Sequence, residues 1–142
     1  MEPALDKYKK KLLKDPKKAF DTLKNGEYIF IHTGCGEPQL LVETLLDEAV
    51  RRNIIGLDVI NVLSLGKSCQ KISQPPYNRY FRHNTLFITK LNRQAVKDGQ
   101  ADYSPVALSD VPRLFEQKIM PIQWALIQVC LNSMLIYQQG SH

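Results

Sequence analysis

The spacing of apolar residues predicts alternating strands and helices. Residues 28–32 form a short apolar, β-branched run typical of a buried strand, and residues 57–63 form a second. Between them, apolar side chains recur every three or four residues over 40–52, which predicts a helix. A strand, a helix and a strand in this order predict a βαβ unit and therefore a parallel sheet.

Similar patterns extend this unit at both ends. Before it we expect an amphipathic helix over 4–14 and another helix from Pro16 to about Lys24. After it the pattern predicts a long polar excursion over 66–80, a strand over 86–88, a helix over 92–98, a strand over 104–106, a helix opening at 109–112 and a last strand over 124–130. The excursion contains two prolines and suggests a lid or an interface loop. We therefore expect residues 1–142 to form one α/β domain, with an open, mostly parallel sheet flanked by helices.

Composition narrows the class of protein. The chain has 142 residues, of which 44% are apolar and 23% charged, enough for one domain with one core. It has no apolar run of membrane-spanning length and no secretory leader at its first residues, so we expect a cytoplasmic protein without a membrane partner. The three cysteines are far apart and the three histidines complete no metal-ligand spacing, so we expect reduced thiols and no metal site.

Positive charge is concentrated at the start of the chain. The net charge is +5, and a cluster of lysines lies within the first 24 residues. A solvated helix face explains such a cluster, and attraction to an anionic cofactor is an alternative. We expect no nucleic-acid partner.

The segment with the strongest chemical signal is the glycine loop, residues 33–38. It follows a strand and precedes a helix, where open α/β sheets bind ligands. Gly34 and Gly36 would let the backbone approach a ligand, and Pro38 suits a first helical turn. Free N–H groups at the helix start could hold a phosphate, a carboxylate or an oxyanion. The spacing matches neither a P-loop nor GxGxxG, so a tight turn alone is an equally open interpretation.

Three blocks of sequence together resemble a known family. They are residues 34–41 (GCGEPQLL), residues 81–105 with FRHNTLF, NRQAV and GQADYSP, and residues 108–129 with LSDVPRLF, MPI and ALIQV. In order and spacing they are similar to the amino-terminal part of the acetyl-CoA hydrolase/transferase family, which includes 4-hydroxybutyrate, acetate and succinate CoA-transferases. The resemblance covers roughly residues 15–129.

This resemblance implies a fold and a chemistry. The family has two similar α/β halves (NagB/RpiA-like) with the active site between them, and it transfers acyl groups through a glutamyl-CoA thioester. The substrates would be an acyl-CoA, with coenzyme A as the thioester carrier, and a small carboxylate, with no covalently bound cofactor. The substrate- and oxyanion-binding residues would be Gly34, Gly36, Glu37 and Pro38, and the residues that could line the cleft are Arg93, Asp102 and Tyr103.

The sequence differs from the family in lacking a match to the family's catalytic glutamate. The family's nucleophilic glutamate lies in the carboxyl-terminal half, and no glutamate here has a matching context, so we expect no catalytic residue in this chain. The end also differs, with an apolar stretch over 131–136. We therefore expect a truncated domain that is inactive without a complementary half. The alternative is a non-catalytic remnant that binds CoA-like anions or self-associates as a homodimer.

Four residues near these motifs have alternative interpretations. Glu37 would be a positioning group or simply a charge at a helix start. His32 ends a buried strand and is expected to be a packed histidine, and Cys35 lacks the His/Asp partners of a nucleophile. Arg93 could reach an anion, cap a helix or pair with Asp102.

Overall fold

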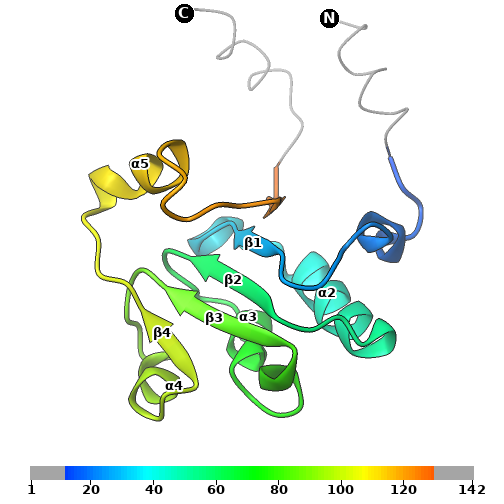
Figure 1. Cartoon of the computed structure of the whole chain (residues 1–142), viewed down its shortest axis with the longest axis horizontal. Coiled ribbons are helices and arrows are strands. Elements are labelled where there is room, and N and C mark those ends of the chain that lie inside the picture. The colour runs from blue at the N-terminus through cyan, green and yellow to red at the C-terminus, as the bar shows by residue number, and fades with distance from the viewer. Residues whose placement is uncertain (1–11, 130–142) are drawn as a thin grey trace, which may run out of the picture.

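The chain forms an open five-stranded sheet in which every neighbouring pair is parallel (Figure 1). The structure is a computed structural model that describes residues 12–129. The strands are β1 (Tyr28–Ile31), β2 (Leu57–Asn61), β3 (Phe81–Thr85), β4 (Ala101–Tyr103) and β5 (Trp124–Leu126), in the spatial order β4-β3-β2-β1-β5. The predicted α/β class and parallel sheet are confirmed.

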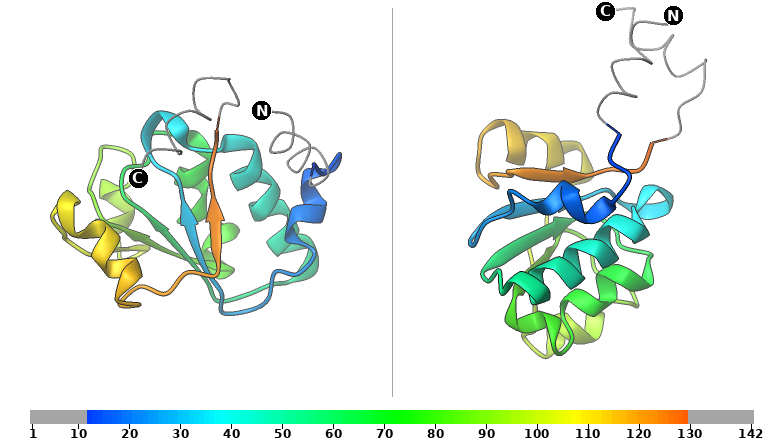
Figure 2. Two further views of the ribbon diagram at one scale, coloured as in Figure 1. Left: turned by 90° about the horizontal axis from the view of Figure 1, so that it is seen from above. Right: turned by 90° about the vertical axis from the view of Figure 1, so that its right-hand side faces the viewer.

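Helices lie on both faces of this sheet, as the two views in Figure 2 show. They are η1 (Pro16–Phe20), η2 (Gly34–Gly36), α2 (Gln39–Arg52), α3 (Lys67–Ile72), η3 (Tyr77–Arg79), α4 (Arg93–Lys97), η4 (Leu108–Asp110) and α5 (Val111–Glu116). Helices α2 and α3 cover one face, and α5 lies over the other.

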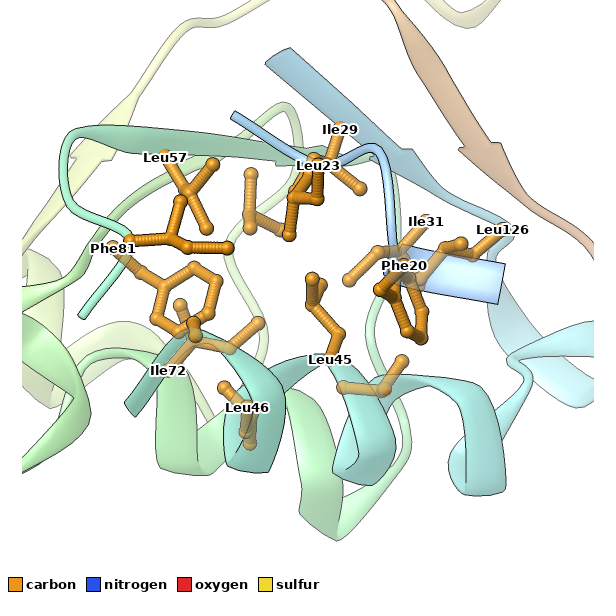
Figure 3. Close-up of a cluster of buried hydrophobic side chains, with 14 of the residues drawn as sticks. Phe20, Leu23, Ile29, Ile31, Leu45, Leu46, Leu57, Ile72, Phe81 and Leu126 are labelled. Carbon is orange, nitrogen blue, oxygen red and sulfur yellow. The ribbon is translucent and has the colours of Figure 1, made fainter. Parts of the chain in front are cut away.

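The main core fills the space between the sheet and α2 (Figure 3). Side chains alternate along a strand, so Ile29 and Ile31 of β1 point to the same face as Leu57 of β2, and all three are fully buried. The helix contributes Leu45 and Leu46 from its apolar stripe. Burying this many large aliphatic side chains, at roughly 1.5–3 kcal/mol each, fixes the βαβ unit.

The face under α5 is packed less completely. Its buried residues are Ile60, Leu86 and Val111, and the rings of Phe30 and Phe115 meet edge to face with centroids 5.4 Å apart. This face therefore has a smaller core than the face under α2.

Capping residues and left-handed backbone conformations define several element boundaries. The Asp15 carboxylate accepts from the Lys17 amide and caps the helix at Pro16, although that helix is a short 3-10 turn that ends at Phe20. Asn53 ends α2 in the left-handed region, at φ 53°, and Gly99 follows α4 at φ 69°. Of the helix expected over 4–14, residues 12–14 are not helical and residues 4–11 lie outside the described part.

Several predicted elements are misplaced. The strand expected over 86–88 is β3 at Phe81–Thr85, and the strand expected over 104–106 is β4 at Ala101–Tyr103. The segment 81–85 carries polar side chains, of which Arg82, His83 and Thr85 have hydrogen-bond partners, so its strand character does not appear as an apolar run. The last strand is shorter than expected and ends at Leu126. The excursion over 66–80 is not irregular, because it contains α3, which packs against α2.

Candidate functional site

Two loops lie side by side at the carboxyl edge of the sheet. They are the glycine loop after β1 and residues 62–66 after β2, which we call the second loop. The Thr33 hydroxyl donates to the Leu63 carbonyl (2.5 Å) and accepts from the Leu63 amide (2.7 Å). The Gly34 amide also donates to the Leu63 carbonyl (2.8 Å). These bonds hold the two loops in a fixed relation.

Glu37 makes a second connection between the same loops. Its side chain is only 4% exposed, and its carboxylate accepts from the Ser64 hydroxyl (3.1 Å) and from the amides of Leu65 (3.1 Å) and Gly66 (3.0 Å). Gln39 donates a fourth bond through Nε2 (2.8 Å). Glu37 therefore positions the second loop and does more than place a charge at a helix start.

The surroundings of Glu37 also change its acidity. Burial alone would raise the pKa of this carboxyl, but hydrogen bonds from Cys69, Gly66, Gln39 and Ser64 outweigh burial and lower it. Burial and the nearby Glu37 carboxylate raise the pKa of the Cys69 thiol. Near neutral pH the pair is thus an ionised carboxylate beside a neutral thiol.

Gly36 and Gly66 make room for contacts within the protein, whereas Gly34 is distinguished by its backbone conformation. Gly34 adopts a positive φ of 62°. A Cβ on Gly36 would lie 2.4 Å from two atoms of the His32 ring, and His32 Nδ1 lies 3.0 Å from the Gly36 carbonyl oxygen. A Cβ on Gly66 would lie 2.2 Å from the Glu37 carboxylate. Gly36 thus makes room for a packed histidine, which is a different reason from the ligand approach inferred from the sequence.

The loop has fewer free N–H groups than its sequence suggests. The amides of Gly36, Glu37 and Gln39 donate to carbonyls within the loop, at 3.3, 3.3 and 3.0 Å. The Cys35 amide has no acceptor among residues 12–129. Pro38 is the N-cap of α2 and not part of its first turn, and its carbonyl accepts from the Val42 amide. Within residues 12–129 the amides of Leu40 and Leu41, in the first turn of α2, also have no acceptor. The candidate anion donors are thus the Cys35 amide in the loop and these two amides at the helix start.

Two hollows adjoin Gly34. The first, which we call the apolar cavity, has a volume of about 390 Å³ and is lined by Thr33, Gly34, Val62, Leu63, Leu86, Phe87, Val106, Leu108 and Val111. The second, which we call the polar hollow after its lining residues, is an open depression of about 520 Å³ lined by Gly34, Cys35, Glu37, Gln39, Glu43, Leu65, Gly66, Lys67 and Ser68. Its exposed surface is nevertheless more apolar than polar. The glycine loop therefore lies between an aliphatic cavity and a hollow that offers polar side chains.

The predicted cleft residues do not line either hollow at the glycine loop. Asp102 pairs with Arg82, through Nε and through Nη2 at 3.0 Å, and not with Arg93. Asp102 also lines a separate cavity of about 420 Å³ together with Gly56, which precedes β2 at the amino edge of the sheet. Arg93 opens α4 and is exposed, and Tyr103 is 43% exposed. Asp102 thus faces the cavity at the amino edge, whereas Asn92 and Ala95, on either side of Arg93, line a small hollow with Ser64 of the second loop.

A buried polar group lies under α3, on the face of the sheet that α2 and α3 cover. His83 of β3 is 2% exposed and lies 3.1 Å from the Ser73 hydroxyl through Nδ1 and 3.3 Å from Asn61 Oδ1 through Nε2. A neutral ring with its proton on Nε2 donates to Asn61 and accepts from Ser73. Burial lowers the pKa of His83 to about 4.

The second loop is what sequence reasoning missed. The hydrophobic pattern places residues 62–63 at the end of a strand and residue 66 at the start of a polar excursion, so it does not indicate a loop at 62–66. A glycine shortly after a buried strand, at Leu65-Gly66, is the signal that could have identified it.

The described residues show neither a membrane span nor a metal cluster. Within 12–129 no helix combines the length and apolar character needed to cross a membrane. In the same range, no three His, Cys, Asp or Glu side chains gather closely enough to hold a metal ion.

Sequence comparison identifies relatives of known activity. The family model described as the acetyl-CoA hydrolase/transferase N-terminal domain matches residues 3–133. The chain is 37% identical over 122 residues to the 4-hydroxybutyrate coenzyme A transferase of Clostridium kluyveri, covering 86% of this chain and 27% of that protein. It is 33% identical over 113 residues to the succinyl-CoA:acetate/propanoyl-CoA:succinate CoA transferase of Fasciola hepatica, covering 78% of this chain and 22% of that protein. The chain thus spans about a quarter of the length of these curated relatives.

Structure comparison supports the same fold. RipA from Yersinia pestis superposes with a TM-score of 0.72 at 22% identity, covering 83% of this chain and 29% of RipA. The E249A mutant of RipA gives a TM-score of 0.72 at 23% identity, with 83% and 28% coverage.

Proposed function

The chain belongs to the acetyl-CoA hydrolase/transferase family, and from this premise we propose that it forms one wall of the active site of an acyl-CoA hydrolase or CoA-transferase. The observation that carries the proposal is the pair of loops at the carboxyl edge of the sheet. They are joined by the Thr33–Leu63 bonds and by the Glu37 carboxylate, and they leave the Cys35 amide without an acceptor within residues 12–129.

The proposed role of the glycine loop is to stabilise an oxyanion. Acyl transfer places negative charge on the thioester carbonyl oxygen, and a fixed N–H group stabilises that charge without rearranging. The donor is the Cys35 amide. Gly34 and Gly36 set the turn, and Glu37 and Pro38 anchor it to the second loop and to α2.

The nucleophile is proposed to come from a complementary carboxyl-terminal half. Four glutamates of the described residues have hydrogen-bond or ion-pair partners. Glu37 accepts from Ser64, Leu65, Gly66 and Gln39, and the buried Glu48 pairs with Arg51. Glu27 accepts from Trp124 and Lys24, and Glu43 pairs with Lys71. A carboxylate so occupied is poorly placed to attack a thioester. The chain is therefore proposed to be inactive alone, and its substrates with a partner half are an acyl-CoA, such as acetyl-CoA, and a small carboxylate.

The proposed cellular location rests on the state of the cysteines. Cys35 is exposed, Cys69 is buried, and both are free thiols in the described structure. Free thiols suit a reducing compartment, so the proposed location is the cytoplasm.

A second candidate function is a non-catalytic module that binds CoA-like anions or self-associates. It is favoured by apolar side chains beyond α5 and around β5, where Ile119, Ile127 and Val129 are 63%, 49% and 72% exposed. A partner half or a second copy of the chain would cover such a surface.

Reconstitution distinguishes the two functions. The full chain is mixed with the remainder of the Clostridium kluyveri relative, the part outside the 27% that this chain matches. We call this remainder the partner half, and complex formation and transfer from acetyl-CoA to a carboxylate are both measured. Each half alone, and a partner half with its nucleophilic glutamate changed to glutamine, are the controls. Turnover in the mixture alone supports the enzyme, whereas a stable complex without turnover supports the non-catalytic module.

A further inference from the structure

The walls of the apolar cavity come from several segments of the chain. Val62 follows β2, Leu86 follows β3, Val106 follows β4, and Val111 begins α5. Leu86 and Val111 are buried, whereas Val62 and Val106 are half-buried. Each of these side chains is aliphatic, so the cavity presents a hydrocarbon surface at the carboxyl edge of the sheet.

The cavity offers no free polar side chain to an occupant. Thr33 carries the sole side-chain hydroxyl among its lining residues, and that hydroxyl already donates to the Leu63 carbonyl and accepts from the Leu63 amide. None of the lining residues is charged. A carboxylate placed inside would lose its hydration without gaining a partner, and burying an unpaired charge is strongly unfavourable.

The cavity is open to solvent on the side formed by Phe87 and Leu108. Phe87 is 57% exposed and Leu108 is 75% exposed, and both line the cavity. Its volume of about 390 Å³ lies within the range of small-molecule sites. A ligand group can therefore enter without displacing the core.

The position of the cavity beside the glycine loop indicates which ligand group it would bind. Gly34 lines both the apolar cavity and the polar hollow, and the free Cys35 amide follows it directly. A thioester carbonyl at that amide would lie between the two hollows, of which only the apolar cavity lacks a charged or free polar side chain. We infer that the apolar cavity binds the aliphatic chain of the acyl group and selects unsubstituted acyl chains over chains that end in a carboxylate. The inference rests on the proposed function, since it requires an acyl thioester at the glycine loop.

Methyl NMR tests the inference on the full chain. Leu and Val methyl groups are isotope-labelled, and the protein is titrated with S-butyryl-N-acetylcysteamine or S-succinyl-N-acetylcysteamine, two thioesters that differ in the acyl terminus. We expect shifts at Val62, Leu86 and Val106 with the butyryl compound, and an affinity for the succinyl compound lower by about tenfold or more. Equal affinities, or no butyryl shifts at these methyls, would overturn the inference.

A rim substitution adds a gain-of-binding test. Leu108→Arg places a cation at the exposed rim, where it can pair with a carboxylate, and we expect the butyryl-to-succinyl preference to fall by about fivefold or more. The matched control is Ile119→Arg, at a site that is also well exposed (63%) and does not line the cavity. An unchanged preference in Leu108→Arg, or the same change in both variants, contradicts the inference.

Failure of this inference is distinguishable from failure of the proposed function. Turnover of acetyl-CoA by the mixed halves tests the function with an acyl group too short to need the cavity. Turnover together with equal butyryl and succinyl affinities would leave the function standing and remove the selectivity. If adding the partner half buries the cavity methyls and blocks the butyryl shifts, the cavity is an interface between halves and the inference is overturned.

Discussion

The Glu37 carboxylate accepts a hydrogen bond from the Gly66 amide at 3.0 Å, and a Cβ at position 66 would lie 2.2 Å from the same carboxylate. Each residue therefore requires the other. The carboxylate holds the second loop in place, and the missing side chain at position 66 lets it approach. This contact joins the loop after β1 to the loop after β2 at the edge where the proposed oxyanion donor lies.

Glu37→Gln should destabilise the fold. The amide side chain keeps the shape but replaces one acceptor oxygen with a donor. Because Gln39 Nε2 binds one carboxylate oxygen and the three second-loop donors bind the other, either Gln39 or the second loop loses its acceptor. We expect a loss of about 2 kcal/mol in the free energy of unfolding, measured with urea. The control is Glu43→Gln, which removes an exposed ion pair with Lys71 and should cost less than about 1 kcal/mol. Equal losses in the two variants would contradict the positioning role.

The same variant should have a pH signature. The folded-state pKa of Glu37 is lowered from 4.5, so its carboxylate stabilises the fold above that value, and this stabilisation is lost as pH falls through the folded-state pKa. The difference between wild type and Glu37→Gln should therefore be largest at neutral pH and shrink below about pH 4.5. A difference that stays constant down to pH 3 would argue against an ionised Glu37.

His83 should govern stability in a higher pH window. Burial lowers its folded-state pKa from 6.5 to about 4, so in that interval the unfolded chain binds a proton that the folded chain excludes. The free energy of unfolding should fall as pH drops from about 6.5 to 4, by up to about 3 kcal/mol for a shift of this size. Urea titrations across this range test the slope, and His83→Gln should flatten it. A variant with the wild-type slope would assign the effect to another group.

The βαβ unit could be predicted because its signals are local. Three sequence patterns predicted this unit: the apolar runs at 28–32 and 57–63 and the apolar stripe over 40–52. Most of their apolar side chains are buried in the strands and the helix that the patterns predicted. Asn53 and Gly99 end helices through backbone conformations that few other residues tolerate. Such signals depend only on residues close together in the sequence, so they can be recognised without knowledge of the tertiary contacts.

Strand β3 could not be predicted in the same way. His83 is satisfied by Ser73 and Asn61, and Arg82 by Asp102, all of them ten or more positions away in sequence. The polar partners that make this segment a strand are therefore non-local. Glu37 presents the same difficulty, since its role depends on the second loop about 27 residues later.

Gly36→Ala should disturb the loop through His32. The added methyl would occupy the space of the imidazole ring, so the ring must move and lose its contact with the Gly36 carbonyl. We expect a loss of about 1–3 kcal/mol in the free energy of unfolding and reduced turnover by the mixed halves. The double variant His32→Ala/Gly36→Ala makes room for the methyl and should lose less than the sum of the single changes. Strict additivity would show that the ring and the glycine are independent.

Asp102→Asn tests whether the far edge of the sheet takes part in the reaction. Asp102 pairs with Arg82 and lines a cavity with Gly56, away from the glycine loop. The pair is exposed, so the substitution should cost less than about 1 kcal/mol and leave turnover by the mixed halves unchanged. Arg93→Ala should behave in the same way. A loss of turnover in either variant without loss of stability would indicate that the substituted residue does line the active-site cleft.

The Cys35 amide is the most direct test of the oxyanion role. Cys35→Ala removes the thiol but keeps the N–H group, so turnover by the mixed halves should be nearly unchanged. Cys35→Pro removes the N–H group, and loss of a single oxyanion donor typically lowers kcat by about 10²–10³-fold. Because proline also restricts the backbone, loop geometry is checked through the amide signals of Leu65 and Gly66, which donate to Glu37. Unchanged loop signals with a large loss of kcat support the donor role. Full activity in Cys35→Pro excludes the amide, and inactivity of Cys35→Ala would instead assign the chemistry to the thiol.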